Sequence, residues 1–131
     1  MKNIAILILL VTLSPACRKS EPLSPNTVIK LEQCYQQASG TETINLCFDG
    51  VMSDSRCPIN ANCVWQGIAL VNFTFSANNH SESFTLATNN AMKPYNTDTV
   101  LQGYKIQLIN LYPYPGEVGS EVKAEVKISK Q

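Results

Sequence analysis

Apolar and polar residues alternate along several short segments of the chain. A period of two is typical of β-strands that bury one face, because successive side chains point to opposite sides. The pattern is clearest over 122–129, where apolar residues stand at every second position and charged residues lie between most of them. Strands are predicted over 28–35, 43–51, 68–76, 83–88, 104–111 and 122–129.

Polar, turn-forming segments separate these strands, at 77–80, 88–97 and 113–119. No stretch of a dozen residues carries the apolar stripe of an amphipathic helix. Short strands joined by polar turns indicate an all-β fold, either a small antiparallel β-sandwich, for which an immunoglobulin-like arrangement is favoured, or an open barrel. Over 68–76, the core face is expected to hold Ala69, Val71, Phe73 and Phe75.

The N-terminus has the features of an export signal. Lys2 precedes the apolar run 4–13, and small residues lead to Ala16 and Cys17. This order is typical of a secretory signal peptide, and the run is too short to span a bilayer. The cysteine after Ala16 resembles a lipobox, although Ser14 stands where that motif usually has leucine. We expect lipidation at Cys17; the alternative is an ordinary signal peptide cut near Ala16.

Arg18 and Lys19 follow the cysteine. By resemblance to lipoprotein sorting in Gram-negative cells, the absence of aspartate there favours the outer membrane of the cell envelope. The polar segment that follows contains two prolines and too few apolar residues to fold, so it is predicted to be a flexible tether. The expected organisation is a signal peptide over 1–16, a lipidated cysteine and tether over 17–27, and a single β domain over 28–131.

Charge excludes one class of partner. The chain has ten basic and ten acidic residues, with formal net charge zero. A nucleic-acid-binding surface needs a concentration of lysine and arginine that the sequence lacks. Contact with a membrane is expected through the lipid at Cys17, and the other expected partner is an envelope protein.

Four cysteines besides Cys17 indicate two disulfides, because exported proteins fold in an oxidising compartment. Four cysteines allow three pairings. Cys57 and Cys63 are closest in sequence and have turn-forming residues between them, so Cys57–Cys63 and Cys34–Cys47 are favoured. A zinc site is less expected because the spacing is not C-x-x-C.

The densest motif runs from D-S-R-C-P at 54–58 to C-V-W-Q-G at 63–67. It resembles a pattern found in small, uncharacterised bacterial lipoproteins, as does the later segment that ends in Y-P-Y-P at 112–115. The resemblance covers most of 44–129 and implies no particular activity. In that family the two motif cysteines often occur without others, which implies the pair Cys57–Cys63 and makes Cys34–Cys47 an addition.

The motif has a structural interpretation. Trp65 is expected to pack over the disulfide or into the core, and Gly67 to allow a bulge or a close backbone approach. Asp54 is expected to cap the turn, and Arg56 to pair with it or with a backbone carbonyl.

Two functional interpretations remain open. Loops on rigid β scaffolds often carry recognition, so Asp54, Arg56, Asn60, Asn62 and Trp65 form a candidate binding loop. A calcium site that adds Asp49 to Asp54 and the Asn60 and Asn62 carbonyls is less favoured, because calcium needs six to eight oxygen ligands. No metal or other cofactor is predicted.

Catalysis is not predicted. His80 is the single histidine, and nothing near it in sequence suggests burial or an orienting carboxylate. Tyr112 and Tyr114 are interpreted as a strand exit, with a carbohydrate or partner patch as the alternative. The sequence therefore predicts a non-enzymatic envelope lipoprotein that binds a protein or small ligand through its loops. The alternative is an accessory subunit or inhibitor of an envelope or secreted hydrolase.

Overall fold

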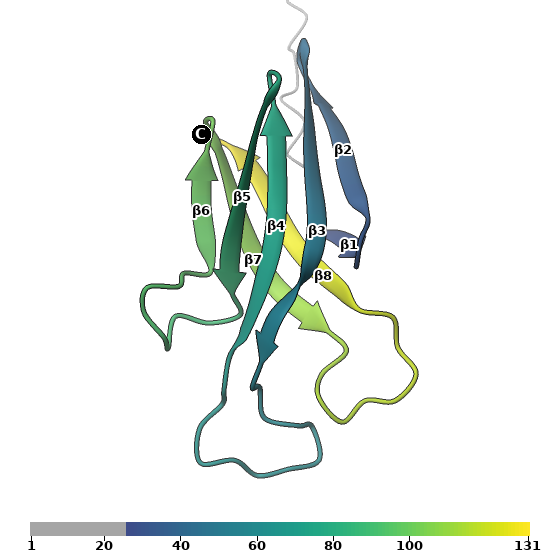
Figure 1. Ribbon diagram of the computed structural model, residues 1–131, viewed down its shortest axis with the longest axis vertical. Helices are drawn as coiled ribbons and strands as arrows, with labels where there is room; N and C mark the ends of the chain where they lie inside the picture. Colours follow the sequence, from purple (N-terminus) through teal and green to yellow (C-terminus); the bar gives the residue numbers. More distant parts are fainter. Residues whose placement is uncertain (1–25) are drawn as a thin grey trace, which may run out of the picture.

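The structure, a computed structural model, describes residues 26–131. The predicted signal peptide, Cys17 and most of the predicted tether lie outside the described residues. Eight β-strands make up the described part, and no helix long and apolar enough to cross a membrane occurs within it. The strands are β1 (Thr27–Lys30), β2 (Cys34–Ser39), β3 (Glu42–Asp54), β4 (Ala69–Ala77), β5 (His80–Ala87), β6 (Asp98–Leu101), β7 (Tyr104–Tyr112) and β8 (Lys123–Lys130) (Figure 1).

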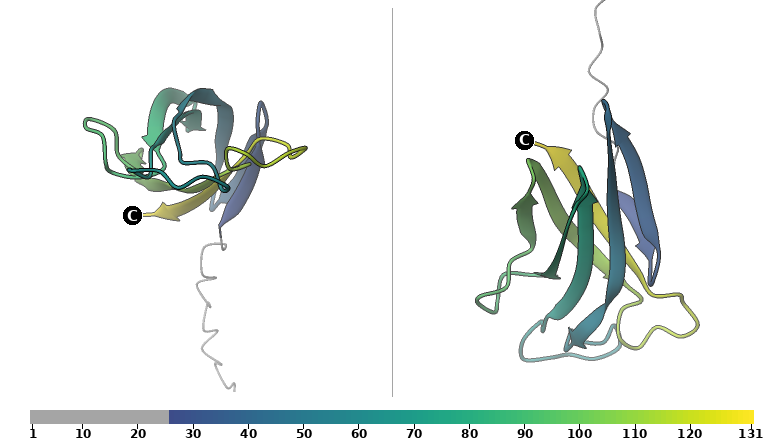
Figure 2. Two further views of the ribbon diagram at one scale, coloured as in Figure 1. Left: turned by 90° about the horizontal axis from the view of Figure 1, so that it is seen from below. Right: turned by 45° about the horizontal axis from the view of Figure 1, so that its top comes forward.

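The strands form two four-stranded antiparallel sheets packed face to face (Figure 2). One sheet has the order β1-β8-β7-β6 and the other the order β2-β3-β4-β5. The predicted β-sandwich is therefore confirmed. Nearly all neighbouring strands are consecutive in the chain, which differs from the Greek-key order of an immunoglobulin domain. The chain instead meanders around the sandwich and crosses between sheets after β1 and after β5.

The core lies between the sheets and uses the predicted alternation. Val71, Phe73 and Phe75 of β4 are fully buried, as is Val126 of β8. Across the interface, the Phe75 ring contacts the Tyr104 ring with a centroid distance of 5.7 Å. Burial of these large apolar side chains is the main stabilising contribution that a fold of this size has available, together with its two disulfides.

Two elements differ from the sequence prediction. The single strand predicted over 28–35 is broken at residues 31–33, where Glu32 has a positive φ, so β1 and β2 enter different sheets. The short edge strand β6 was not predicted, because its four residues lack a clear alternation and pair only with β7. Leu70 alternates with the core-facing residues of β4, and it is buried in a second small cluster against which Tyr95 packs.

Three long loops leave the same end of the sandwich: 55–68, 88–97 and 113–122. Tight hairpins and the C-terminus lie at the opposite end (Figure 1). We call the end with the three long loops the loop end. It includes the segment that the sequence singled out as a candidate binding loop.

Candidate functional site

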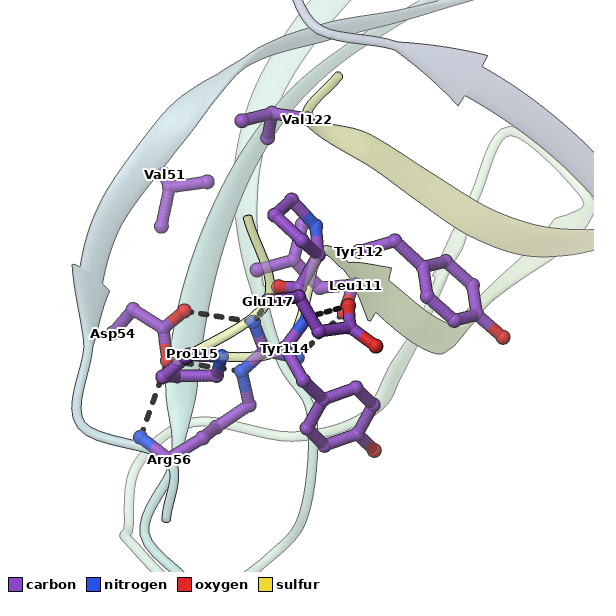
Figure 3. A pocket seen from close by; sticks show the side chains of 11 residues that line it. Val51, Asp54, Arg56, Leu111, Tyr112, Tyr114, Pro115, Glu117 and Val122 are labelled. Carbon is purple, nitrogen blue, oxygen red and sulfur yellow. Dashed lines mark hydrogen bonds and ion pairs between the residues drawn. The ribbon is translucent and has the colours of Figure 1, made fainter. Parts of the chain in front are cut away.

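Arg56 is the one buried charged residue within the described part of the chain, with 7% of its surface exposed. Its Nε donates to Asp54 Oδ1 at 2.9 Å and its Nη2 donates to Asp54 Oδ2 at 2.7 Å (Figure 3). The backbone N–H of Arg56 also donates to Asp54 Oδ1, at 3.1 Å. Asp54 therefore caps the start of loop 55–68 and pairs with Arg56, as predicted.

The same guanidinium reaches the neighbouring loop. Nη1 donates to the Leu111 carbonyl at 2.5 Å, and Nη2 donates to the Pro113 carbonyl at 2.8 Å. The guanidinium carbon lies 4.7 Å from the centre of the Tyr114 ring. Four of its five N–H groups are thus hydrogen-bonded, so Arg56 fastens loop 55–68 to the exit of β7. Charge-assisted hydrogen bonds of this kind are the strong ones.

Gly67 closes the base of loop 55–68. It has a φ of +71°, and a Cβ placed there would lie 1.9 Å from the Ser55 carbonyl oxygen. The two sides of the loop also exchange backbone hydrogen bonds, from Ser55 N–H to Ile68 and from Cys57 N–H to Gln66. The close approach predicted at Gly67 is therefore present.

Both favoured disulfides are formed. Cys57 and Cys63 close the tip of loop 55–68. Cys34 and Cys47 face each other across β2 and β3. The first bridge restricts the loop that carries the candidate binding residues, and the second fixes the edge strand of the sheet.

The three loops are linked to one another. Ile59 N–H donates to the Pro115 carbonyl at 3.1 Å, which joins the tip of loop 55–68 to loop 113–122. Asn89 Nδ2 donates to the Gly67 carbonyl at 2.7 Å, which joins loop 88–97 to the other side of loop 55–68. The loop end is consequently one connected surface, with loop 55–68 in the middle.

Trp65 does not pack in the core, which was one of the two positions predicted for it. Trp65 is 54% exposed, its neighbour Val64 is fully exposed, and Ile59 is 61% exposed. The physical reason is that residues 57–66 extend beyond the ends of the strands, where no facing sheet can cover them (Figure 1).

The five residues of the candidate binding loop therefore separate into two groups. Asn60, Asn62 and Trp65 are exposed near the tip. Arg56 lies inside the base of the loop, and the Asp54 carboxylate is engaged by it. The tip residues are exposed without being engaged by Arg56, so they are the ones best placed to meet a partner.

Two depressions flank the contact between Arg56 and Tyr114. The first has a volume of about 380 Å³ and is mainly apolar, with Val51, Leu111, Pro115 and Val122 in its wall (Figure 3). The Glu117 carboxylate at its rim accepts a hydrogen bond from the Tyr114 N–H at 2.7 Å. The second, of about 320 Å³, is lined by Gln66, Thr88, Asn89 and Asn110.

The sequence analysis named Arg56 and Tyr114, which line the second depression, but it did not predict that Gln66, Thr88, Asn89 and Asn110 join them there. The lining comes from three segments far apart in the chain. Gln66 belongs to the motif at 63–67, whereas Thr88, Asn89 and Asn110 were interpreted only as parts of a turn or strand. No spacing or motif signals that these segments meet, because the meeting depends on how the two sheets stack.

The residues considered for calcium are not brought together. Asp49 accepts a hydrogen bond from Thr74 Oγ1 at 2.7 Å on the outer face of its sheet, whereas Asp54 pairs with Arg56. Within residues 26–131, no three histidine, cysteine or acidic side chains form a group suited to a metal ion. His80 is exposed at the start of β5, at the end of the sandwich opposite the loop end.

Comparison with known proteins finds no matching family model, no matching curated protein and no matching solved structure. A functional assignment therefore depends on the chemistry and geometry of this chain.

Proposed function

We propose that this chain is an envelope lipoprotein, exported by residues 1–16 and anchored through a lipid on Cys17, whose β domain is a non-enzymatic module that captures an envelope protein with its loop end. The export pattern, the lipobox-like cysteine and the resemblance of 54–67 to bacterial lipoproteins support the anchoring. Two disulfides suit an oxidising compartment. Arg18 and Lys19 support the outer membrane as the destination.

One observation carries the binding role. Ile59, Val64 and Trp65 are apolar, exposed and placed on a loop whose conformation is held by a disulfide and by Arg56. Exposed apolar side chains on a fixed loop lower the free energy when a partner covers them. Tryptophan is also enriched among the residues that dominate protein interfaces.

Rigidity adds to this interpretation. Binding by a mobile loop loses conformational entropy when the loop becomes ordered. Here the Cys57–Cys63 bridge and the hydrogen bond from Ile59 to Pro115 fix the loop before any partner arrives. Residues 57–66 contain no charged side chain, which fits an uncharged, apolar surface on the partner.

The test is site-specific photo-crosslinking of the full-length, lipidated protein in its own host. A photoreactive residue replaces Val64 at the loop end or, as the matched control, the exposed Val100 on edge strand β6. The expected result is one dominant protein adduct from position 64, absent from position 100 and lost when Trp65→Ala is added. Equal and diffuse adducts from both positions would contradict the proposal.

An inhibitor or accessory subunit of an exported hydrolase is the second candidate. The observation that favours it is the projection of a disulfide-closed loop beyond the strands, a shape that fits a concave enzyme cleft (Figure 1). In that case the adduct from position 64 is a hydrolase, and the protein inhibits or activates it. Trp65→Ala abolishes this effect while the control at position 100 retains it. A dominant partner without hydrolase activity would exclude this second candidate.

A further inference from the structure

The second depression of the loop end, which we call the amide pocket, has the composition of a ligand site. Its polar wall consists of Gln66, Thr88, Asn89 and Asn110, and the Tyr114 ring lies beside them. The volume of about 320 Å³ falls at the lower end of the range found for small-molecule sites. All three long loops, or the strand ends next to them, contribute to it.

Several polar groups in the amide pocket have hydrogen-bonding capacity left. Asn110 Oδ1 accepts from the Leu111 N–H at 2.9 Å, which leaves the Nδ2 group to donate elsewhere. Thr88 Oγ1 accepts from the Ala69 N–H at 3.0 Å and keeps its own proton to donate. Gln66 and Tyr114 add an amide and a hydroxyl group to the lining. The pocket therefore offers donors and acceptors together.

The frame of the pocket is fixed by other contacts. Asn89 uses both ends of its amide, donating to the Gly67 carbonyl and accepting from the Ala91 N–H at 3.0 Å. Arg56 lies at the boundary between the two depressions, and its guanidinium lies over the Tyr114 ring. The side chains of Thr88 and Asn110, which are held by hydrogen bonds to backbone N–H groups, consequently project from a preorganised wall, and this lowers the entropic cost of binding a small ligand.

The charge balance selects the class of ligand. Arg56 is the one charged residue in the wall, and Asp54 neutralises it through two hydrogen bonds. An ionised ligand would find no free counter-charge and would lose its hydration. Carboxamides and hydroxyls instead match a ligand that donates and accepts at adjacent positions, and an aromatic ring suits the apolar C–H face of a sugar.

From these contacts we infer that the amide pocket binds a neutral saccharide. Gln66 and Asn110 bind the sugar hydroxyls, Thr88 donates a further hydrogen bond, and Tyr114 borders the sugar ring. The site is separate from the proposed protein-binding tip, because Ile59, Val64 and Trp65 do not line it. The saccharide is either free or part of an envelope glycan, since both present the same hydroxyl groups.

The test is saturation-transfer NMR on the full-length, lipidated protein in a detergent that contains no sugar. The probes are maltose, lactose and the disaccharide of N-acetylglucosamine, each at millimolar concentration. N-acetylglycine methylamide is the peptide-like comparison. The expected result is saturation of at least one disaccharide and not of the amide. A soluble glycan polymer built from the same sugar then competes with the disaccharide if the natural ligand is a polymeric glycan. The polymer does not compete if the natural ligand is the free sugar.

Two variants address the wall directly. Gln66→Ala removes an exposed amide, and Asn110→Asp keeps the acceptor for the Leu111 N–H while removing the amide donor. Each is expected to weaken binding about tenfold, the effect of one lost hydrogen bond. Gln36→Ala, on the exposed side of β2, is the control and leaves binding unchanged. Thermal unfolding midpoints of all three variants report that the fold is intact.

Three results would overturn the inference. The first is absence of saturation for every disaccharide of the panel. The second is binding that Gln66→Ala and Asn110→Asp leave unchanged. The third is saturation of N-acetylglycine methylamide alone, which would make the pocket a peptide site. None of these affects the crosslinking test at Val64, so failure of the saccharide site and failure of the protein-binding tip are distinguishable.

Discussion

Gly67 faces Ser55 so closely that a side chain at Gly67 would begin 1.9 Å from the Ser55 carbonyl oxygen. The two residues close the base of loop 55–68, on which Trp65 and both cysteines of the Cys57–Cys63 bridge are carried. The position of the candidate binding tip thus depends on a contact that only glycine permits. The close contact with Ser55 therefore explains why the motif has glycine at this position.

Gly67→Ala is expected to lower the free energy of unfolding by more than about 3 kcal/mol. The left-handed backbone at this φ costs a non-glycine residue roughly 1–2 kcal/mol, and the collision with Ser55 adds to that. Gly40→Ala is the matched control, because Gly40 has a φ of +67° and open space around it. It is expected to cost only about 1–2 kcal/mol. Urea unfolding measures both, and equal losses would show that the contact with Ser55 relaxes freely.

Arg56→Lys is expected to destabilise the domain by roughly 2–3 kcal/mol, since a lysine cannot reproduce the fork that contacts Asp54, Leu111 and Pro113 together. The control is Lys105→Met, which breaks the exposed pair with Asp98 and is expected to cost less than about 1 kcal/mol. Denaturant unfolding of the two variants provides the comparison. Retention of full stability in Arg56→Lys would mean that a single charge suffices at this position.

The two disulfides are expected to differ in what they contribute. Replacing Cys57 and Cys63 by serine should cost about 2 kcal/mol, and replacing Cys34 and Cys47 about 3 kcal/mol, because the second pair spans more residues and restricts the unfolded chain more. Urea unfolding of the oxidised proteins checks the order. A larger loss for the shorter loop would indicate that native contacts of the tip outweigh chain entropy.

The Cys57–Cys63 pair is also expected to matter for binding. Without it, the tip that carries Val64 and Trp65 is less restricted and loses more entropy on association. The crosslinking yield from position 64 should therefore fall in the Cys57→Ser, Cys63→Ser variant and persist in the Cys34→Ser, Cys47→Ser variant. Equal yields in both variants would show that Arg56 and Ile59 alone hold the tip in place.

Lys30 is expected to control the titration of Glu121. A hydrogen bond and the charge of Lys30, whose Nζ lies 2.7 Å from Glu121 Oε2, hold the pKa of Glu121 below its ordinary value of 4.5. A lowered folded-state pKa stabilises the fold above the unfolded pKa, and this contribution disappears as the pH falls through the folded pKa. Lys30→Met should therefore raise the pKa of Glu121, as followed by NMR of its carboxyl carbon, whereas Lys127→Met should leave it unchanged.

Much of the β-sandwich could be predicted from interactions between residues close together in the sequence. The alternation in β4 and β8 determines which side chains enter the core, because a strand turns successive residues to opposite faces. The spacing of Cys57 and Cys63 and their turn-forming neighbours allowed the short bridge to be predicted, and Asp54 beside Arg56 allowed the capped turn. These features involve residues close together in the chain, whose interactions depend little on the rest of the fold.

Contacts between distant segments could not be predicted. The break at Glu32, which divides one apparent strand between two sheets, depends on where β3 and β8 stand in space. Trp65 is exposed because the strands are too short to reach it, so the tip of the loop projects beyond both sheets. Likewise, the amide pocket exists because Gln66, Asn89 and Asn110 meet at one end of the sandwich.

The sequence by itself determined the all-β class and favoured the short Cys57–Cys63 bridge and the close backbone approach at Gly67, because these depend on backbone preferences and on neighbours in the chain. Only the tertiary structure decided the meandering strand order and the burial of Arg56 beneath Tyr114. It also decided that three loops join at one end. The physical reason is that stacking two sheets brings together residues more than fifty positions apart in the chain, such as Arg56 and Leu111. No local sequence pattern indicates that such distant residues are in contact.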